Sequence, residues 1–196
     1  MNEQYFTSKP TSESRPIRFN ADILGISCAF TTDAGVFSRG ELDEGTRILL
    51  EALPEIHGRA LDLGCGWGAV GVTLGKKYPN ANFVLADVNE RALELSRRNL
   101  RDNGVENAET ALSDAFQSLS GTFDFIITNP PIRAGKAVIY GMFDRAKDFL
   151  ASDGRLFIVI RKQQGAPSAV KHLEEIYASV QMIAREKGYW VIECRK

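Results

Sequence analysis

Residues 61–68 read Leu-Asp-Leu-Gly-Cys-Gly-Trp-Gly, with a glycine at every second position from the fourth onward. The apolar run at 60–63 predicts a buried strand, and the apolar spacing over 69–77 predicts a helix. Glycines between a strand and a helix let the backbone turn tightly beneath a bound ligand. Residues 66–71 also match the dinucleotide pattern G-x-G-x-x-G, which is a weak signal alone. The Asp62 carboxylate suits a ligand with a positively charged amino group better than a pyrophosphate.

Strand and helix patterns alternate from this stretch to the end of the chain, which predicts an α/β fold. The expected strands are 60–63, 82–86, 108–112, 123–128, 155–160, 180–185 and 189–194, and the expected helices are 69–77, 89–100, 143–150 and 166–177. This order predicts a Rossmann-like, seven-stranded, mostly parallel sheet with helices on both faces and a C-terminal antiparallel hairpin.

The sequence before this core has a different texture. Residues 1–22 are polar and aperiodic, and we expect a flexible N-terminal arm there. Residues 23–58 are expected to form a hairpin, built on 26–32 and 36–37, followed by a helix. The α/β core would then occupy residues 59–196.

The composition argues against several classes of protein. The 196 residues carry a net charge of −1, unlike the global basic field of a strong autonomous nucleic-acid binder. The 3 cysteines lie far apart and the 2 histidines have no acidic or cysteine neighbour, so no disulfide framework, metal site or histidine-based triad is indicated. We see no signal peptide and no apolar run long enough to span a membrane, and therefore expect a cytoplasmic protein.

A second informative stretch is Phe123–Ile132, where an apolar run stops at Asn129-Pro130-Pro131. Two prolines cannot continue a central β-ladder, so a rigid turn should follow the strand. The turn would lie at the carboxyl edge of the sheet, where open α/β sheets bind ligands. The Asn129 amide and the Pro130 carbonyl would be available there.

Together these stretches resemble the motifs of class I S-adenosylmethionine-dependent methyltransferases. The glycine turn is similar to their first motif, and Asp87 fits the next expected position. The chain is most similar to the small-domain family related to bacterial 16S ribosomal RNA guanine-N2 methyltransferases. This likeness is carried by residues 30–38, 42–46, 129–136 and 161–166, and it extends over roughly residues 5–196.

The resemblance implies S-adenosylmethionine as the cofactor and no metal. Asp62 would face the amino group of the cofactor, Asp87 both ribose hydroxyls, and Asp114 the adenine amino group. An N-cap or an exposed turn would explain Asp114 nearly as well. Residues 23–58 would pack over the cofactor site. The implied cofactor-binding residues are Phe37, Ser38, Thr46, Asp62, Gly64, Cys65, Gly66, Gly68, Asp87, Val88, Ser113, Asp114 and Asn129, with Asp43 and Gly45 as secondary candidates.

The proline turn resembles the Asn-Pro-Pro-aromatic motif of amino-methylating enzymes, which implies the catalytic residues Asn129, Pro130, Pro131 and Ile132. The Asn129 side-chain oxygen and the Pro130 carbonyl would accept the two N–H groups of an amine and aim its lone pair at the methyl group. Ile132 replaces the aromatic residue, so a target base cannot stack there. The aromatic residues expected to replace it are Phe30, Phe37, Tyr140 or Phe143.

Residues 131–162 hold seven Lys or Arg against three Asp, a local charge of +4. Arg133, Lys136, Arg161 and Lys162 follow strands on the catalytic edge, and we expect them to bind RNA phosphates. The expected reaction is N-methylation of an exocyclic amine, first of all guanine N2 in ribosomal RNA, bare or within a ribosomal particle. The alternatives are a protein glutamine amide, adenine N6, a non-catalytic RNA-binding or assembly factor, or a nicotinamide oxidoreductase. The oligomeric state stays open, as a monomer or a weak dimer.

Overall fold

The computed structural model describes residues 12–196 and contains a seven-stranded sheet with the order β5-β4-β3-β6-β7-β9-β8. The first five strands of that order are parallel, and β9 runs antiparallel to its neighbours β7 and β8. The strands are β3 (Arg59–Leu63), β4 (Asn82–Asp87), β5 (Ala108–Leu112), β6 (Phe123–Thr128), β7 (Leu150–Arg161), β8 (Ser179–Glu186) and β9 (Tyr189–Arg195). The predicted sheet, with its C-terminal antiparallel hairpin, is confirmed.

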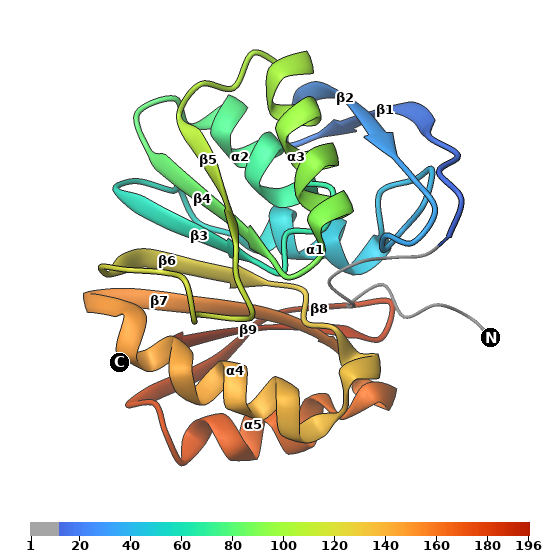
Figure 1. Ribbon diagram of the computed structural model, residues 1–196. Helices are drawn as coiled ribbons and strands as arrows, with labels where there is room; N and C mark the ends of the chain where they lie inside the picture. Colours follow the sequence, from blue (N-terminus) through green and yellow to red (C-terminus); the bar gives the residue numbers. More distant parts are fainter. Residues whose placement is uncertain (1–11) are drawn as a thin grey trace.

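Helices cover both faces of the sheet, as Figure 1 shows. One face carries α1 (Glu44–Ala52), α2 (Ala69–Lys77) and α3 (Glu90–Asp102), and the other carries α4 (Lys136–Phe149) and α5 (Ala166–Glu174). Two short 3-10 helices, η1 (Ile132–Ala134) and η2 (Lys162–Gln164), lie just before α4 and α5. Each face has its own apolar core, so the central strands are buried on both sides.

The N-terminal hairpin differs from the prediction. β2 (Ile26–Thr32) pairs antiparallel with β1 (Ile17–Ile23), and 36–37 is not a strand, so the predicted pairing is wrong. The two residues between the strands both have positive φ, the geometry of the two-residue turns that match the twist of paired strands. The first of them is a leucine, which rarely adopts this conformation, and the turn therefore gave no sequence signal.

The predicted arm at 1–22 is only partly described. Residues 1–11 lie outside the described part of the chain, and the end of the predicted arm belongs to β1. In residues 12–16, which precede β1, Ser14 donates a hydrogen bond to the Asp33 carboxylate at 2.6 Å. The Arg91 guanidinium donates to the Ser12 carbonyl at 2.8 Å. Residues 12–22 are therefore attached to the domain.

The bounds of two other elements differ from the predicted ones without a change in topology. The helix predicted at 143–150 begins seven residues earlier, because Ile139 and Met142 extend its buried face toward the sheet edge. The strand predicted at 155–160 begins at Leu150, through an irregular pairing with β6. None of the helices in residues 12–196 is long and apolar enough to cross a membrane.

The strand order creates a crevice at one edge of the sheet. The chain runs outward from β3 through β4 to β5, and then crosses back to form β6 on the other side of β3. The connections after β3 and β6 therefore diverge, and ligands of open α/β sheets bind at such a switch point. Asp62 on β3 is paired with Ile127 on β6, so the glycine turn and the Asn-Pro-Pro turn that follow are neighbours at this edge.

Candidate functional site

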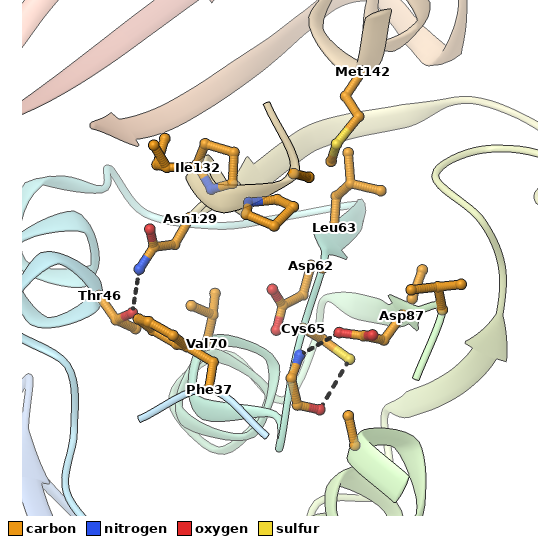
Figure 2. A pocket seen from close by; sticks show the side chains of 18 of the residues that line it. Phe37, Thr46, Asp62, Leu63, Cys65, Val70, Asp87, Asn129, Ile132 and Met142 are labelled. Carbon is orange, nitrogen blue, oxygen red and sulfur yellow. Dashed lines mark hydrogen bonds between the residues drawn. The ribbon is translucent and has the colours of Figure 1, made fainter. Parts of the chain in front are cut away.

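A cavity of about 690 Å³ lies at the carboxyl edge of the parallel strands. Its walls come from the turns after β3, β4 and β6 and from the segment between β2 and α1, as Figure 2 shows from close by. The sequence-predicted residues that line it are Phe37, Ser38, Asp43, Thr46, Asp62, Gly64, Cys65, Gly66, Asp87, Val88, Ser113, Asp114, Asn129, Pro130, Pro131, Ile132, Arg133 and Arg161. Gly45, Gly68, Lys136 and Lys162 do not line it.

The glycine turn leaves open space on its cavity side. Gly64 and Gly66 have φ values of 74° and 56°, and a Cβ built on either residue would meet no atom within 4 Å. Gly68, with φ 89°, lies below the turn, where a Cβ would stand 3.0 Å from the Ser96 hydroxyl. The first two glycines therefore shape a cradle for a ligand, whereas the third allows close packing between the turn and α3.

Asp62 is a buried carboxylate at the end of β3, with an exposed fraction of only 4 %. It accepts a hydrogen bond from the Gly71 N–H at 2.9 Å, and burial raises its pKa to about 7, with a further contribution from the nearby Asp87. Within residues 12–196, no Lys, Arg or His forms an ion pair with it. A buried carboxylate without a cation fits a ligand that brings its own ammonium group.

Asp87 lies at the end of β4, the strand that pairs with β3. Burial raises its pKa, while backbone hydrogen bonds oppose that shift. One carboxylate oxygen accepts the Gly66 N–H at 2.8 Å and the other accepts the Asn89 N–H at 2.8 Å. Each oxygen keeps a second lone pair, so the carboxylate is rigidly held and can still accept two hydroxyl donors. This geometry fits a ribose.

The adenine side of the expected site is more open. Asp114 lines the cavity and is exposed. The Ser113 hydroxyl donates to the Ala115 carbonyl at 2.9 Å and accepts the Ser118 N–H at 3.1 Å, so it organises the turn after β5. Cys65 is buried, and burial raises the pKa of its thiol well above the usual value. A thiol in that state is a poor nucleophile, and its small size is what the turn requires.

The Asn-Pro-Pro turn is anchored from two sides. The Thr128 hydroxyl donates to the Leu63 carbonyl at 2.8 Å, which joins the end of β6 to the glycine turn. The Asn129 side-chain nitrogen donates to the Asp43 carboxylate at 3.1 Å and to the Thr46 hydroxyl at 3.0 Å. Both acceptors belong to the start of α1, where Asp43 is the N-cap. Figure 2 shows the oxygen end of Asn129 turned away from Thr46.

The aromatic residues expected to replace Ile132 lie in different places. Phe30 and Phe143 are each only 1 % exposed inside the two cores, and Tyr140 stacks on the His172 ring at 4.1 Å outside the cavity lining. Phe37, with 38 % exposure, lines the cavity. Of these residues only Phe37 can therefore meet a ligand in the cavity.

Sequence reasoning missed Tyr189, which also lines the cavity. The Arg161 guanidinium lies 4.6 Å from the centre of its ring. Tyr189 begins an antiparallel strand, and the start of such a strand lies at the edge where its parallel neighbours end. That topological signal was present in the predicted closing hairpin. Met142 and Val70 also line the cavity and carried no comparable sequence signal. Gln164 lines it too, and it lies in the stretch 161–166 that carries part of the family resemblance.

The expected basic residues divide into two pairs. Arg133 and Arg161 line the cavity, while Lys136 and Lys162 are exposed just outside it. Across the described part of the chain, no group of three or more His, Cys, Asp or Glu residues could hold a metal ion. The cavity lining thus holds four carboxylates, those of Asp43, Asp62, Asp87 and Asp114, and the basic residues lie at its edge and just outside it.

The sequence that forms this site matches a known family model. Residues 27–193 match the model described as the methyltransferase small domain. The chain belongs to this family. Relatives named as ribosomal RNA methyltransferases and a solved structure that contains AdoMet agree with this family, so the predictions of enzyme class and cofactor are confirmed at the level of the family.

Two of the most similar curated relatives differ in length from one another. An uncharacterized protein of Bacillus subtilis, YbxB, is 40 % identical over 200 residues and covers 100 % of both chains. Ribosomal RNA small subunit methyltransferase C of Aeromonas hydrophila is 42 % identical over 129 residues, covering 64 % of this chain and 37 % of its own length. The matched segment thus makes up well under half of the named methyltransferase.

A solved structure agrees with these relatives. The 16S rRNA guanine-N2 methyltransferase of T. thermophilus, in complex with AdoMet and guanosine, superposes with a TM-score of 0.84 at 30 % identity. The match covers 95 % of this chain and 52 % of that one. The fold of the small domain is therefore shared over nearly its whole length.

Proposed function

We propose that this small domain methyltransferase transfers a methyl group from S-adenosylmethionine to N2 of a guanine in ribosomal RNA, in the cytoplasm. The observation that carries the proposal is that the Asn-Pro-Pro turn lines the same cavity as Asp62, Asp87 and the glycine turn. An amine bound at Asn129 would therefore adjoin the cofactor cradle. Two of the proteins compared above are named as ribosomal RNA methyltransferases, which supports the choice of substrate.

The cofactor, when bound, supplies a methyl group already activated on a sulfonium. The chain's contribution is to position the amine and to favour the charge that develops on it. Asn129 and the Pro130 carbonyl accept the two N–H groups, which holds a delocalised and weakly nucleophilic nitrogen with its lone pair directed into the cavity. Asp62 and Asp87 hold the cofactor, with Phe37 and Ser38 over it.

The substrate would enter from the basic rim. Arg133, Lys136, Arg161 and Lys162 supply the charges for RNA phosphates, and a base from a paired region would have to leave its stack to reach Asn129. Aromatic rings stack on bases with little regard for sequence. We assign that contact to Phe37 and Tyr189, because Trp67, the other aromatic residue of the cavity lining, is buried with 3 % exposure.

The test is tritiated methyl transfer to bare 16S RNA, assembled small subunits and a protein extract, followed by nucleoside and amino-acid analysis. The expected product is N2-methylguanosine. N6-methyladenosine or methylated glutamine would instead support the same chemistry on another substrate. Cofactor binding without transfer to any of these substrates would support the assembly-factor alternative.

A further inference from the structure

Three polar side chains meet where the Asn-Pro-Pro turn faces the start of α1. The Asn129 side-chain nitrogen donates to the Asp43 carboxylate at 3.1 Å and to the Thr46 hydroxyl at 3.0 Å. The Thr46 hydroxyl in turn points toward the same carboxylate oxygen, at 3.4 Å. The nitrogen end of the Asn129 amide is therefore held by two acceptors within the protein.

This arrangement fixes which end of the amide faces the ligand. A carboxylate only accepts hydrogen bonds, so turning the amide over would place its oxygen against another acceptor. We infer that Asp43 and Thr46 are positioning residues, which lock Asn129 with its oxygen directed toward the substrate amine. The inference rests on the amine-methylating role proposed above for Asn129.

The contact of Asn129 with Asp43 and Thr46, called the lock from here on, is itself held rigidly. As the N-cap of α1, the Asp43 carboxylate also accepts the Thr46 backbone N–H at 2.9 Å. Gly45, between the two residues, packs so closely on Tyr189 that a Cβ would stand 2.7 Å from the ring. Thr46 is buried, with 6 % exposure. These contacts hold the two acceptors in place.

The lock also strengthens the acceptor. A hydrogen bond from an amide N–H to a carboxylate is charge-assisted, and bonds in series polarise one another. The electron density drawn toward the Asn129 oxygen makes it a better acceptor for the substrate N–H. The nearby negative charge of Asp43 also favours the positive charge that develops on the nitrogen during transfer.

The test compares Thr46→Val, Thr46→Ser and Thr73→Val. Valine has the shape of threonine without the acceptor, and Thr46→Val leaves the Asp43 cap intact. Thr73 is a fully buried threonine in α2, outside the cavity lining, so Thr73→Val controls for the same change elsewhere. For each variant we would measure kcat, KM for RNA, cofactor Kd and the side-chain amide proton shifts of Asn129, assigned by their loss in Asn129→Ala.

We expect Thr46→Val to lower kcat by about 10- to 100-fold with cofactor Kd unchanged, and to move the Asn129 amide protons. Thr46→Ser should return kcat to within about threefold of wild type, because the hydroxyl is restored. A raised cofactor Kd with unchanged kcat would make Thr46 a cofactor contact and overturn the inference. The inference would also be overturned if Thr46→Val and Thr73→Val gave the same kcat and the same Asn129 amide proton shifts. If wild type methylates no substrate, the proposed function fails, and the amide shifts still decide whether the lock exists.

Discussion

The two turns at the cavity lie on neighbouring strands and are built in different ways. The main contacts of the glycine turn are local. Asp62 accepts a hydrogen bond from Gly71, 9 positions away, and Asp87 accepts one from Gly66, 21 positions away. In the Asn-Pro-Pro turn the functional amide is held by residues 83 and 86 positions earlier, in the segment before the α/β core. The cofactor contacts proposed for Asp62 and Asp87 are thus encoded within one β-α-β unit, whereas the amine contact proposed for Asn129 depends on tertiary packing.

This difference predicts that the two halves fail separately. Changes at the glycine turn or at Asp87 should weaken cofactor binding first. Changes at Asn129 or its partners should reduce turnover while the cofactor still binds. If any of the variants below affected both functions equally, the two turns would form one cooperative unit and the comparison would be wrong.

The largest effect is expected for Asn129→Ala. Removing an acceptor aimed at the developing charge should lower kcat by roughly 10³-fold or more, while the cofactor Kd changes by less than about threefold. Single-turnover methyl transfer and calorimetry with S-adenosylmethionine measure the two quantities. Turnover close to wild type would show that Asn129 does not hold the amine.

Asp87→Ala tests the other half. The loss of hydrogen bonds from two ribose hydroxyls to a carboxylate should raise the cofactor Kd by roughly 10²-fold, and kcat at saturating cofactor should fall much less. Asp153→Ala, which changes an exposed carboxylate outside the cavity lining, is the matched control. Equal affinities for the two variants would argue against the ribose contact.

The same contrast explains how far sequence reasoning reached. The sheet, its order of elements and the cofactor cradle follow from hydrophobic periodicity and from a glycine motif whose contacts are local. The contact of Asn129 with Asp43 and Thr46 could not be derived from the sequence, because each residue has a common structural explanation by itself. Asp43 is explained as an N-cap, Thr46 as a helix residue and Asn129 as a turn amide. The β1–β2 hairpin was missed for a similar reason, since its turn places a leucine where glycine or asparagine is usual.

The pH dependence of cofactor binding should also separate the halves. Asp62 has its pKa raised to about 7 by burial, so it gains a proton as the pH falls below 7 and loses its attraction for an ammonium group. The Kd for S-adenosylmethionine should therefore rise by about tenfold for each pH unit below that point.

Methylthioadenosine, which lacks the amino group, provides the control for this experiment. Its affinity should be nearly independent of pH, and Asp62→Asn should remove the pH dependence for S-adenosylmethionine as well. A persisting dependence in Asp62→Asn would assign the titration to another group. Asp87, whose pKa is also raised by burial, would be the next candidate.

The smallest effect is expected at the basic rim, where Lys162→Gln should alter RNA binding without affecting the cofactor. Lys162 is exposed at the start of η2, beside the cavity edge, and we expect its loss to remove one phosphate contact. RNA affinity should fall a few-fold, and the slope of log K against log salt should decrease by about 1. Lys171→Gln, on an exposed position of α5, is the matched control and should leave the slope unchanged. Equal slopes for the two variants would exclude Lys162 from the RNA surface. An unchanged cofactor Kd in both would show that the rim and the cofactor cradle are energetically independent.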